Sequence, residues 1–141
     1  MPMSPFVQRF PELGTNETRT ITTAGLQGLP ADEYALLEHF CNEPGCDCRR
    51  VLFSVIARRT GETLAFINFG WESRDFYKRK LGLDEHAREV IAGSLDPMQP
   101  QSRHAPILLA MVREVLEDRA YVERLARHYA MFKAPVRRTR G

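Results

Sequence analysis

The chain has 141 residues, 43% of them hydrophobic and 27% charged, with a formal net charge of +2. This length fits one domain with a core of its own, and the composition excludes global disorder. So small a charge does not by itself indicate a nucleic-acid partner. No apolar run approaches the roughly 20 residues of a membrane-spanning helix, and the first residues lack the charged and apolar regions of a signal peptide. We therefore expect a cytoplasmic protein without membrane contact.

The first 30 residues combine prolines, glycines and threonines with little periodicity. They predict an extended N-terminal arm over residues 1–30, with at most a short strand near Thr18–Thr23. A single domain is expected to follow over residues 31–133. Residues 134–141 contain three arginines and predict a basic C-terminal tail.

Two strands with a hairpin turn between them are predicted near the middle of the chain. Residues 50–57 and 63–70 are rich in β-branched and aromatic side chains, and Gly61 between them suits the left-handed position of a turn. Residues 31–41 contain good helix formers. We interpret them as a strand nevertheless, because a metal-binding loop is well held between two paired strands.

Helices are predicted over the second half of the chain. The segment 71–80 mixes aromatic and charged side chains, and residues 84–92 begin with a capping aspartate and precede a glycine. Apolar residues recur at helical spacing over 107–116, and Asp118 can cap a last helix. The predicted fold class is therefore α+β: a small antiparallel sheet of two or three strands carries a cysteine loop, and three or four helices follow.

All three cysteines of the chain lie within eight residues: Cys41, Cys46 and Cys48. A reduced thiol gains little from such clustering, whereas thiolates are the preferred ligands of zinc in structural sites. Pro44 and Gly45 favour a tight reversal that can fold Cys41 back toward the other two cysteines. An odd number of cysteines also argues against a closed disulfide framework. The spacing therefore predicts a zinc site.

A tetrahedral zinc site needs a fourth ligand. In a strand, His39 lies on the same face as Cys41, so His39 is the first candidate. Alternatives are His104, at the start of a predicted helix, Asp47, a water molecule or a group from another subunit. His128 lies among charged helical residues and is expected to be solvated.

Two other interpretations of the cysteines stay open. They can be free, partly buried thiols that act as small hydrophobic side chains. They can also carry thiol redox chemistry. The sequence holds no Cys-x-x-Cys motif, however, and a bridge between Cys46 and Cys48 would be strained.

The segments Phe40–Val51 and Phe69–Tyr77 resemble those of a family of small bacterial proteins of unassigned activity, which have a Cys-x4-Cys-x-Cys segment. Some members of that family are associated with SEC-C-type metal-binding motifs. The resemblance extends through Leu95–Pro97 and Pro100–Ser102 to the last predicted helix. It implies a bacterial, cytosolic, metal-binding protein and transfers no activity.

The leading functional hypothesis is a zinc-binding protein in which the metal is structural and which binds another, unidentified protein. The sequence contains no Gly-rich phosphate loop, Ser-His-Asp order or paired-histidine hydrolase motif. A second hypothesis is nucleic-acid binding through the arginine-rich turn at residues 58–59 and the basic tail. A third is a metal- or thiol-dependent enzyme, which needs a concave pocket and an open coordination position beside the cysteines. A homo-oligomer is compatible with each hypothesis.

Overall fold

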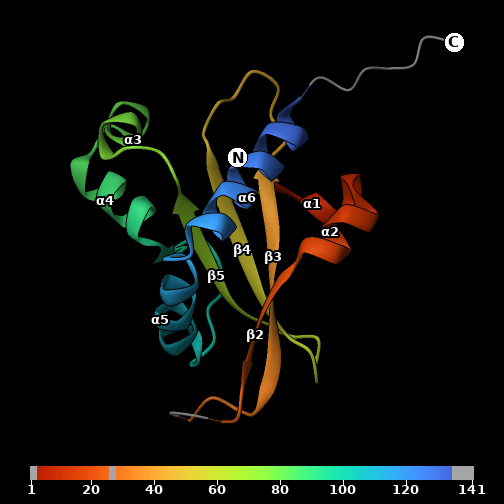
Figure 1. Ribbon diagram of the computed structural model, residues 1–141. Coiled ribbons are helices and arrows are strands. Elements are labelled where there is room, and N and C mark those ends of the chain that lie inside the picture. Colours follow the sequence, from red (N-terminus) through yellow and green to blue (C-terminus); the bar gives the residue numbers. More distant parts are fainter. Residues whose placement is uncertain (1–2, 26–27, 135–141) are drawn as a thin grey trace, which may run out of the picture.

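The computed structural model describes residues 3–25 and 28–134 (Figure 1). These residues form six strands: β1 (Met3–Pro5), β2 (Arg19–Thr23), β3 (Asp32–Cys41), β4 (Arg50–Ala57), β5 (Thr63–Gly70) and β6 (Ser94–Leu95). They also form six helices: α1 (Phe6–Arg9), α2 (Pro11–Glu17), α3 (Arg74–Leu81), α4 (Asp84–Ala92), α5 (Ala105–Val115) and α6 (Arg119–Lys133). The predicted basic tail lies almost entirely outside the described residues.

The strands form one antiparallel sheet in the order β1-β3-β4-β5-β6, with β2 also paired to β3. β1 and β2 share the same edge of β3. Pro5 of β1 lies opposite His39 near the end of β3, whereas Thr23 of β2 lies opposite Asp32 at its beginning. Helices α1 and α2 connect these two edge strands, so the N-terminal residues complete one side of the sheet (Figure 1).

The three long strands confirm the strand predictions. β3 alternates buried and partly buried side chains from Tyr34 to Phe40, as expected for a strand whose two faces differ. β4 and β5 pair in register from Arg50 opposite Gly70, and Gly61 in their connection has a φ of 73°. This left-handed conformation is easily adopted by glycine and strained for other residues.

The predicted sheet of two or three strands and the predicted three or four helices were both too few. The missing strands are short: β1 has three residues and β6 has two. Such segments are held by backbone hydrogen bonds to a long neighbour, so they need no run of β-branched side chains that the sequence would reveal. The predicted extended arm contains β1, α1, α2 and β2, of which only β2 was expected.

Helices α3 and α6 begin at capping residues, the latter at the expected Asp118, whereas Asp84, expected to cap α4, is the first residue of that helix and Leu83 holds the cap position. Ser73 accepts a hydrogen bond from the backbone of Phe76 at the start of α3, and Gly82 ends that helix in the left-handed conformation. The carboxylate of Asp118 accepts from the backbone N–H of Ala120 at the start of α6. These contacts satisfy backbone groups that the helix itself leaves without partners.

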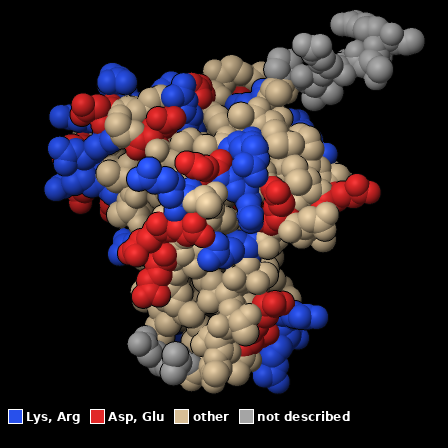
Figure 2. Space-filling model, in the orientation of Figure 1, with Lys and Arg blue, Asp and Glu red and all other residues tan. Residues whose placement is uncertain are grey.

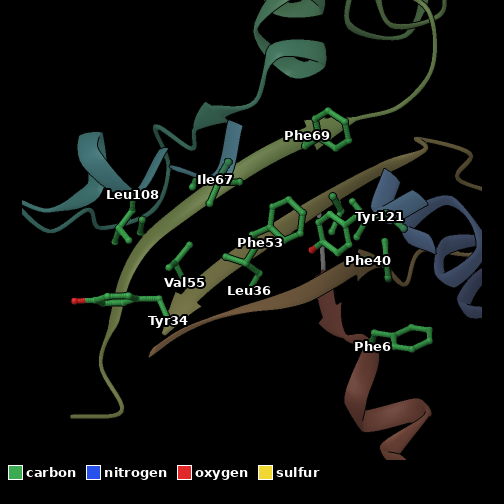
Figure 3. Close-up of a cluster of buried hydrophobic side chains, with 14 of the residues drawn as sticks. Phe6, Tyr34, Leu36, Phe40, Phe53, Val55, Ile67, Phe69, Leu108 and Tyr121 are labelled. Carbon is green, nitrogen blue, oxygen red and sulfur yellow. The ribbon is translucent and has the colours of Figure 1, made fainter. Parts of the chain in front are cut away.

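The main core lies between one face of the sheet and the helices α1, α5 and α6. From the sheet, Leu36, Phe53 and Val55 are fully buried, and from the helices Leu108 and Leu125 are fully buried (Figure 3). A second, smaller cluster around Tyr77 joins α3 and α4. Gly70 lets this cluster approach β5, because a Cβ there would collide with the Tyr77 phenol group.

A buried ionic bridge crosses the main core. His128 of α6 is 1% exposed, and its Nδ1 lies 2.7 Å from Glu38 Oε1 of β3. Its Nε2 lies 2.6 Å from Glu17 Oε1 of α2, and its ring stacks on Phe6. The prediction that His128 is solvated was wrong, because both of its ring nitrogens are used inside the protein.

Candidate metal centre

The three cysteines lie at the two ends of the connection between β3 and β4. Cys41 is the last residue of β3, and Cys46 and Cys48 precede β4 by a few residues. The chain reverses between them: the backbone N–H of Cys46 donates to Glu43 O at 3.2 Å, and Gly45 has a φ of 79°. The reversal that Pro44-Gly45 predicted therefore brings the cysteines together.

The Sγ atoms of Cys41, Cys46 and Cys48 all lie within 4.8 Å of one another. Zinc–sulfur bonds of about 2.3 Å place tetrahedral ligands about 3.8 Å apart, so a contraction of about 1 Å suffices to surround an ion. Cys41 and Cys48 are buried, and Cys46 is partly exposed. The cluster is therefore able to hold a soft metal ion close to the surface of the protein.

A fourth protein ligand is not supplied by the described part of the chain. The group of cysteines has no additional His, Cys, Asp or Glu member there. His39 Nε2 instead lies 2.8 Å from Ser54 Oγ, and His104 lines a separate cavity together with Tyr34. His39 as a ligand stays a prediction that needs a different side-chain arrangement.

Asp47, the remaining candidate, is engaged elsewhere. Its carboxylate accepts hydrogen bonds from Arg49, the shortest at 2.8 Å, and from the hydroxyl of Tyr129 at 3.1 Å. The hydrogen bond from Arg49 holds the pKa of Asp47 below its ordinary value. The carboxylate is thus a charged anchor that joins the cysteine loop to α6.

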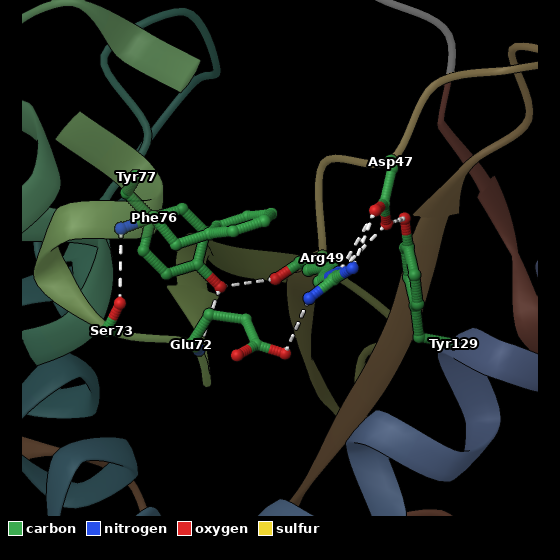
Figure 4. A network of polar contacts seen from close by, with 7 residues as sticks. All are labelled: Asp47, Arg49, Glu72, Ser73, Phe76, Tyr77 and Tyr129. Atoms are coloured by element: carbon green, nitrogen blue, oxygen red, sulfur yellow. Dashed lines mark hydrogen bonds and ion pairs between the residues drawn. The ribbon is translucent and has the colours of Figure 1, made fainter. Parts of the chain in front are cut away.

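Arg49 fixes the end of the cysteine loop from the other side as well (Figure 4). It has a φ of 47°, in the left-handed region, and its Nη1 lies 3.3 Å from Glu72 Oε2. Its guanidinium group lies 4.7 Å from the centre of the Phe76 ring. Its carbonyl accepts a hydrogen bond from Tyr77 Oη at 2.5 Å. Residues after β5 therefore hold the loop that precedes β4.

The C-terminal helix α6 contacts the beginning of the cysteine loop, near Cys41. Lys133 Nζ donates to the carbonyl oxygens of Cys41 at 3.1 Å and Glu43 at 3.0 Å. Trp71 packs edge-on against Tyr129, with ring centres 5.4 Å apart. No spacing in the sequence links Lys133 or Tyr129 to the cysteines, so sequence reasoning missed both contacts.

A cavity of about 260 Å³ lies beside two of the cysteines. Its lining includes Cys46, Cys48, Tyr77 and two cationic side chains, Arg50 and Lys80. An enzyme or ligand-binding site at the metal would need such a concavity. Asp47 also lines it, and this carboxylate is already paired with Arg49.

Cys46 does not have the properties of a reactive thiol. Burial, together with the neighbouring Cys41 and Cys48 thiols, raises the pKa of Cys46 to about 11. Catalytic and redox-active cysteines have lowered pKa values, because the thiolate is the nucleophile. The surroundings of Cys46 therefore suit a protonated thiol whose proton a bound metal displaces.

Positive charge does not gather into a nucleic-acid-binding stripe on the visible face of the protein. Figure 2 shows Lys and Arg side chains interspersed with Asp and Glu. In the arginine-rich turn, Arg58 pairs with Glu33 at 3.1 Å, and the backbone N–H of Arg59 donates to Asp32. Glu33 thus offsets one of the two arginine charges of this turn.

Comparison with protein-family models, curated proteins and solved structures finds no match to this chain. The resemblance to the family of small bacterial proteins therefore stays a prediction. None of the described helices is both long and apolar enough to cross a membrane.

Proposed function

We propose that this protein is a small cytoplasmic zinc-binding protein that acts as a protein-interaction module. In this proposal Cys41, Cys46 and Cys48 hold the ion, and the metal is structural. The convergence of three sulfur atoms within 4.8 Å carries the proposal. The ion would close the connection between β3 and β4, which Lys133 and Asp47 already join to α6.

A structural role is favoured over a catalytic one by the donor set. Three thiolates donate so much charge that the metal becomes a weak Lewis acid, which does not suit hydrolytic chemistry. The proposal leaves the fourth position to water, to His39 after a side-chain rearrangement, or to an external ligand.

Metal analysis tests this proposal directly. Protein purified without a chelator is expected to contain close to one equivalent of zinc, measured by elemental analysis. Replacing Cys48 by serine should weaken zinc binding by more than about 100-fold, since even changes outside the ligand set cost about 10–100-fold. The matched variant His86→Gln should keep the metal, because His86 is exposed on α4 and does not line the cavity beside the cysteines. Folded wild-type protein that takes up no zinc would refute the proposal.

The cavity beside Cys46 and Cys48 favours a second candidate, in which the metal also binds a small anion. Arg50 and Lys80 line this cavity and would neutralise the charge of the anion. Such a site would recognise a carboxylate or phosphate group at the open coordination position of the metal.

Cobalt-loaded protein separates the two candidates, because cobalt replaces zinc and absorbs visible light. If the metal binds an anion, titration with acetate should change the visible spectrum, and Lys80→Gln should weaken the titration about tenfold. A surface variant far from the cavity, Arg58→Gln, should leave it unchanged. A spectrum that acetate does not alter would leave only the structural role.

A further inference from the structure

A second cavity, of about 540 Å³, lies at the opposite end of β3 and β4 from the cysteine cluster. Three segments line it: the beginning of β3, the hairpin between β4 and β5, and residues 102–104, which lead into α5. Its volume lies within the range of about 300–1,000 Å³ that is typical of small-molecule sites. It shares no lining residue with the cavity at Cys46 and Cys48, so the proposed metal site does not account for it.

The floor of the second cavity is apolar. Tyr34 and Ala57 lie opposite each other on β3 and β4, and they are only 1% and 5% exposed. Leu64 of β5 is partly buried and packs against the main core. Figure 3 shows Tyr34 at one end of that core. These side chains offer a surface on which an apolar or aromatic group can pack.

Hydrogen bonds between distant segments hold the walls of the second cavity in place. The backbone N–H of Ser102 donates to Leu64 O at 3.0 Å, which joins the segment before α5 to β5. The backbone N–H of Arg59 donates to the carboxylate of Asp32 at 3.1 Å, which joins the hairpin to β3. The cavity is therefore formed before any ligand enters, and binding does not have to order its walls.

Two arginines, Arg59 and Arg103, line the second cavity. Within the part of the chain that the structure describes, neither guanidinium group forms an ion pair. The imidazole of the neighbouring His104 is half-buried and has no hydrogen-bond partner among the same residues. These side chains supply hydrogen-bond donors, and two of them also supply positive charge, to a group inside the cavity.

The acidic side chains of the lining leave both arginines unpaired. The carboxylate of Asp32 accepts hydrogen bonds from the backbone N–H groups of Glu33 at 2.7 Å and Arg59 at 3.1 Å, so both of its oxygen atoms are used. Glu62 is exposed in the hairpin, where water screens its charge. The first turn of α5 contains no acidic residue, so the positive end of the helix dipole adds to the arginine charges. The cavity therefore favours an anionic group.

We propose that the second cavity binds a small organic acid. The carboxylate or phosphate group of this acid lies between Arg59, Arg103 and His104, since guanidinium groups bind such oxyanions through paired, charge-assisted hydrogen bonds. Its apolar body packs on Tyr34 and Leu64. The proposal does not depend on whether the cysteines bind a metal.

Titration of the isotope-labelled full chain, followed by NMR, tests this site with phenylacetate and phenyl phosphate. At least one of the two acids should bind and shift the backbone signals of Tyr34, Leu64 and Arg103, and the tighter one identifies the head group. The neutral analogue phenylacetamide should bind at least about tenfold more weakly than phenylacetate, because it cannot form charge-assisted hydrogen bonds.

Glutamine variants identify the groups that bind the head group. Arg59→Gln and Arg103→Gln should each weaken binding about tenfold, and both residues are exposed, so the fold should persist. The matched control is Arg58→Gln, because Arg58 pairs with Glu33 and does not line the cavity. Glu62→Gln removes a negative charge from the lining and should not weaken binding.

Three results would each overturn the proposal. The first is that neither acid binds at concentrations up to about 10 mM. The second is that phenylacetamide binds as tightly as phenylacetate, which would mean that the arginines recognise no anion. The third is a set of shifted signals centred on Cys46 and Cys48, which would place the acid in the cavity at the proposed metal site.

Discussion

Replacing His128 by leucine is expected to lower the free energy of unfolding by about 3–5 kcal/mol, the cost of removing one partner from a buried charge pair. His128 is 1% exposed and bonded at both ring nitrogens. Leucine has a similar size but donates no hydrogen bond, so the carboxylate of Glu38 would stay buried without its partner. Urea unfolding followed by circular dichroism measures this loss.

Two variants distinguish a lost pair from a damaged core. Replacing both Glu38 and His128 by leucine should recover most of the stability, because an apolar pair of similar volume often matches a buried ion pair. His86 is exposed on α4, and His86→Leu should change stability by no more than about 0.5 kcal/mol. A loss below about 1 kcal/mol in His128→Leu would contradict the ionic bridge.

The same bridge predicts how stability depends on pH. Burial opposes the charging of His128, but hydrogen bonds and charges from Glu38 and Glu17 outweigh it and raise the pKa of His128 above 6.5. The bridge therefore stabilises the fold fully below about pH 6.5 and loses that contribution as the pH rises through the raised value. At acidic pH, the hydrogen bond from His128 lowers the pKa of Glu17 below 4.5. The stability that the Glu17 carboxylate contributes is therefore lost as the pH falls through the lowered value. The stability difference between wild type and His128→Leu should be largest between these limits.

The parts of this fold that are predictable from sequence are those that a local pattern determines. The strands β4 and β5, the turn at Gly61 and the cap at Asp118 each follow from neighbouring residues. The short strands β1 and β6 depend on a partner strand that is distant in the sequence. Helix α2 brings Glu17 to His128, which is 111 positions away in the sequence. No local sequence pattern predicts a contact between residues so far apart.

The same division applies to the candidate site. The convergence of the three cysteines follows from their spacing and the Pro44-Gly45 reversal. The contacts that hold the cysteine loop in place do not follow from spacing. Arg49 pairs with Glu72, and Lys133 binds the carbonyl of Cys41 from 92 positions away. Sequence therefore indicates which atoms can bind a metal, whereas tertiary contacts decide how firmly the loop that carries them is held.

Zinc is expected to stabilise the protein by about 4 kcal/mol when free zinc exceeds its dissociation constant about 1,000-fold. Thermal or urea unfolding with and without a chelator measures this difference. Under the same conditions Cys48→Ser should be stabilised by no more than about 1.4 kcal/mol, since it binds zinc more than about 100-fold more weakly. If the free energy of unfolding of the wild-type protein did not change with zinc, the ion would not be part of the folded structure.

The gain in stability should be distributed unevenly over the fold. Of the three proposed ligands, the main core contains the two buried thiols of Cys41 and Cys48, and this core is large enough to fold without the ion. Hydrogen exchange of the metal-free protein should therefore remain slow in β4 and β5. It should accelerate over residues 42–49, and also near Lys133, whose ammonium group binds the carbonyls of Cys41 and Glu43. Equal acceleration throughout the sheet would instead mean that the metal holds the whole fold together.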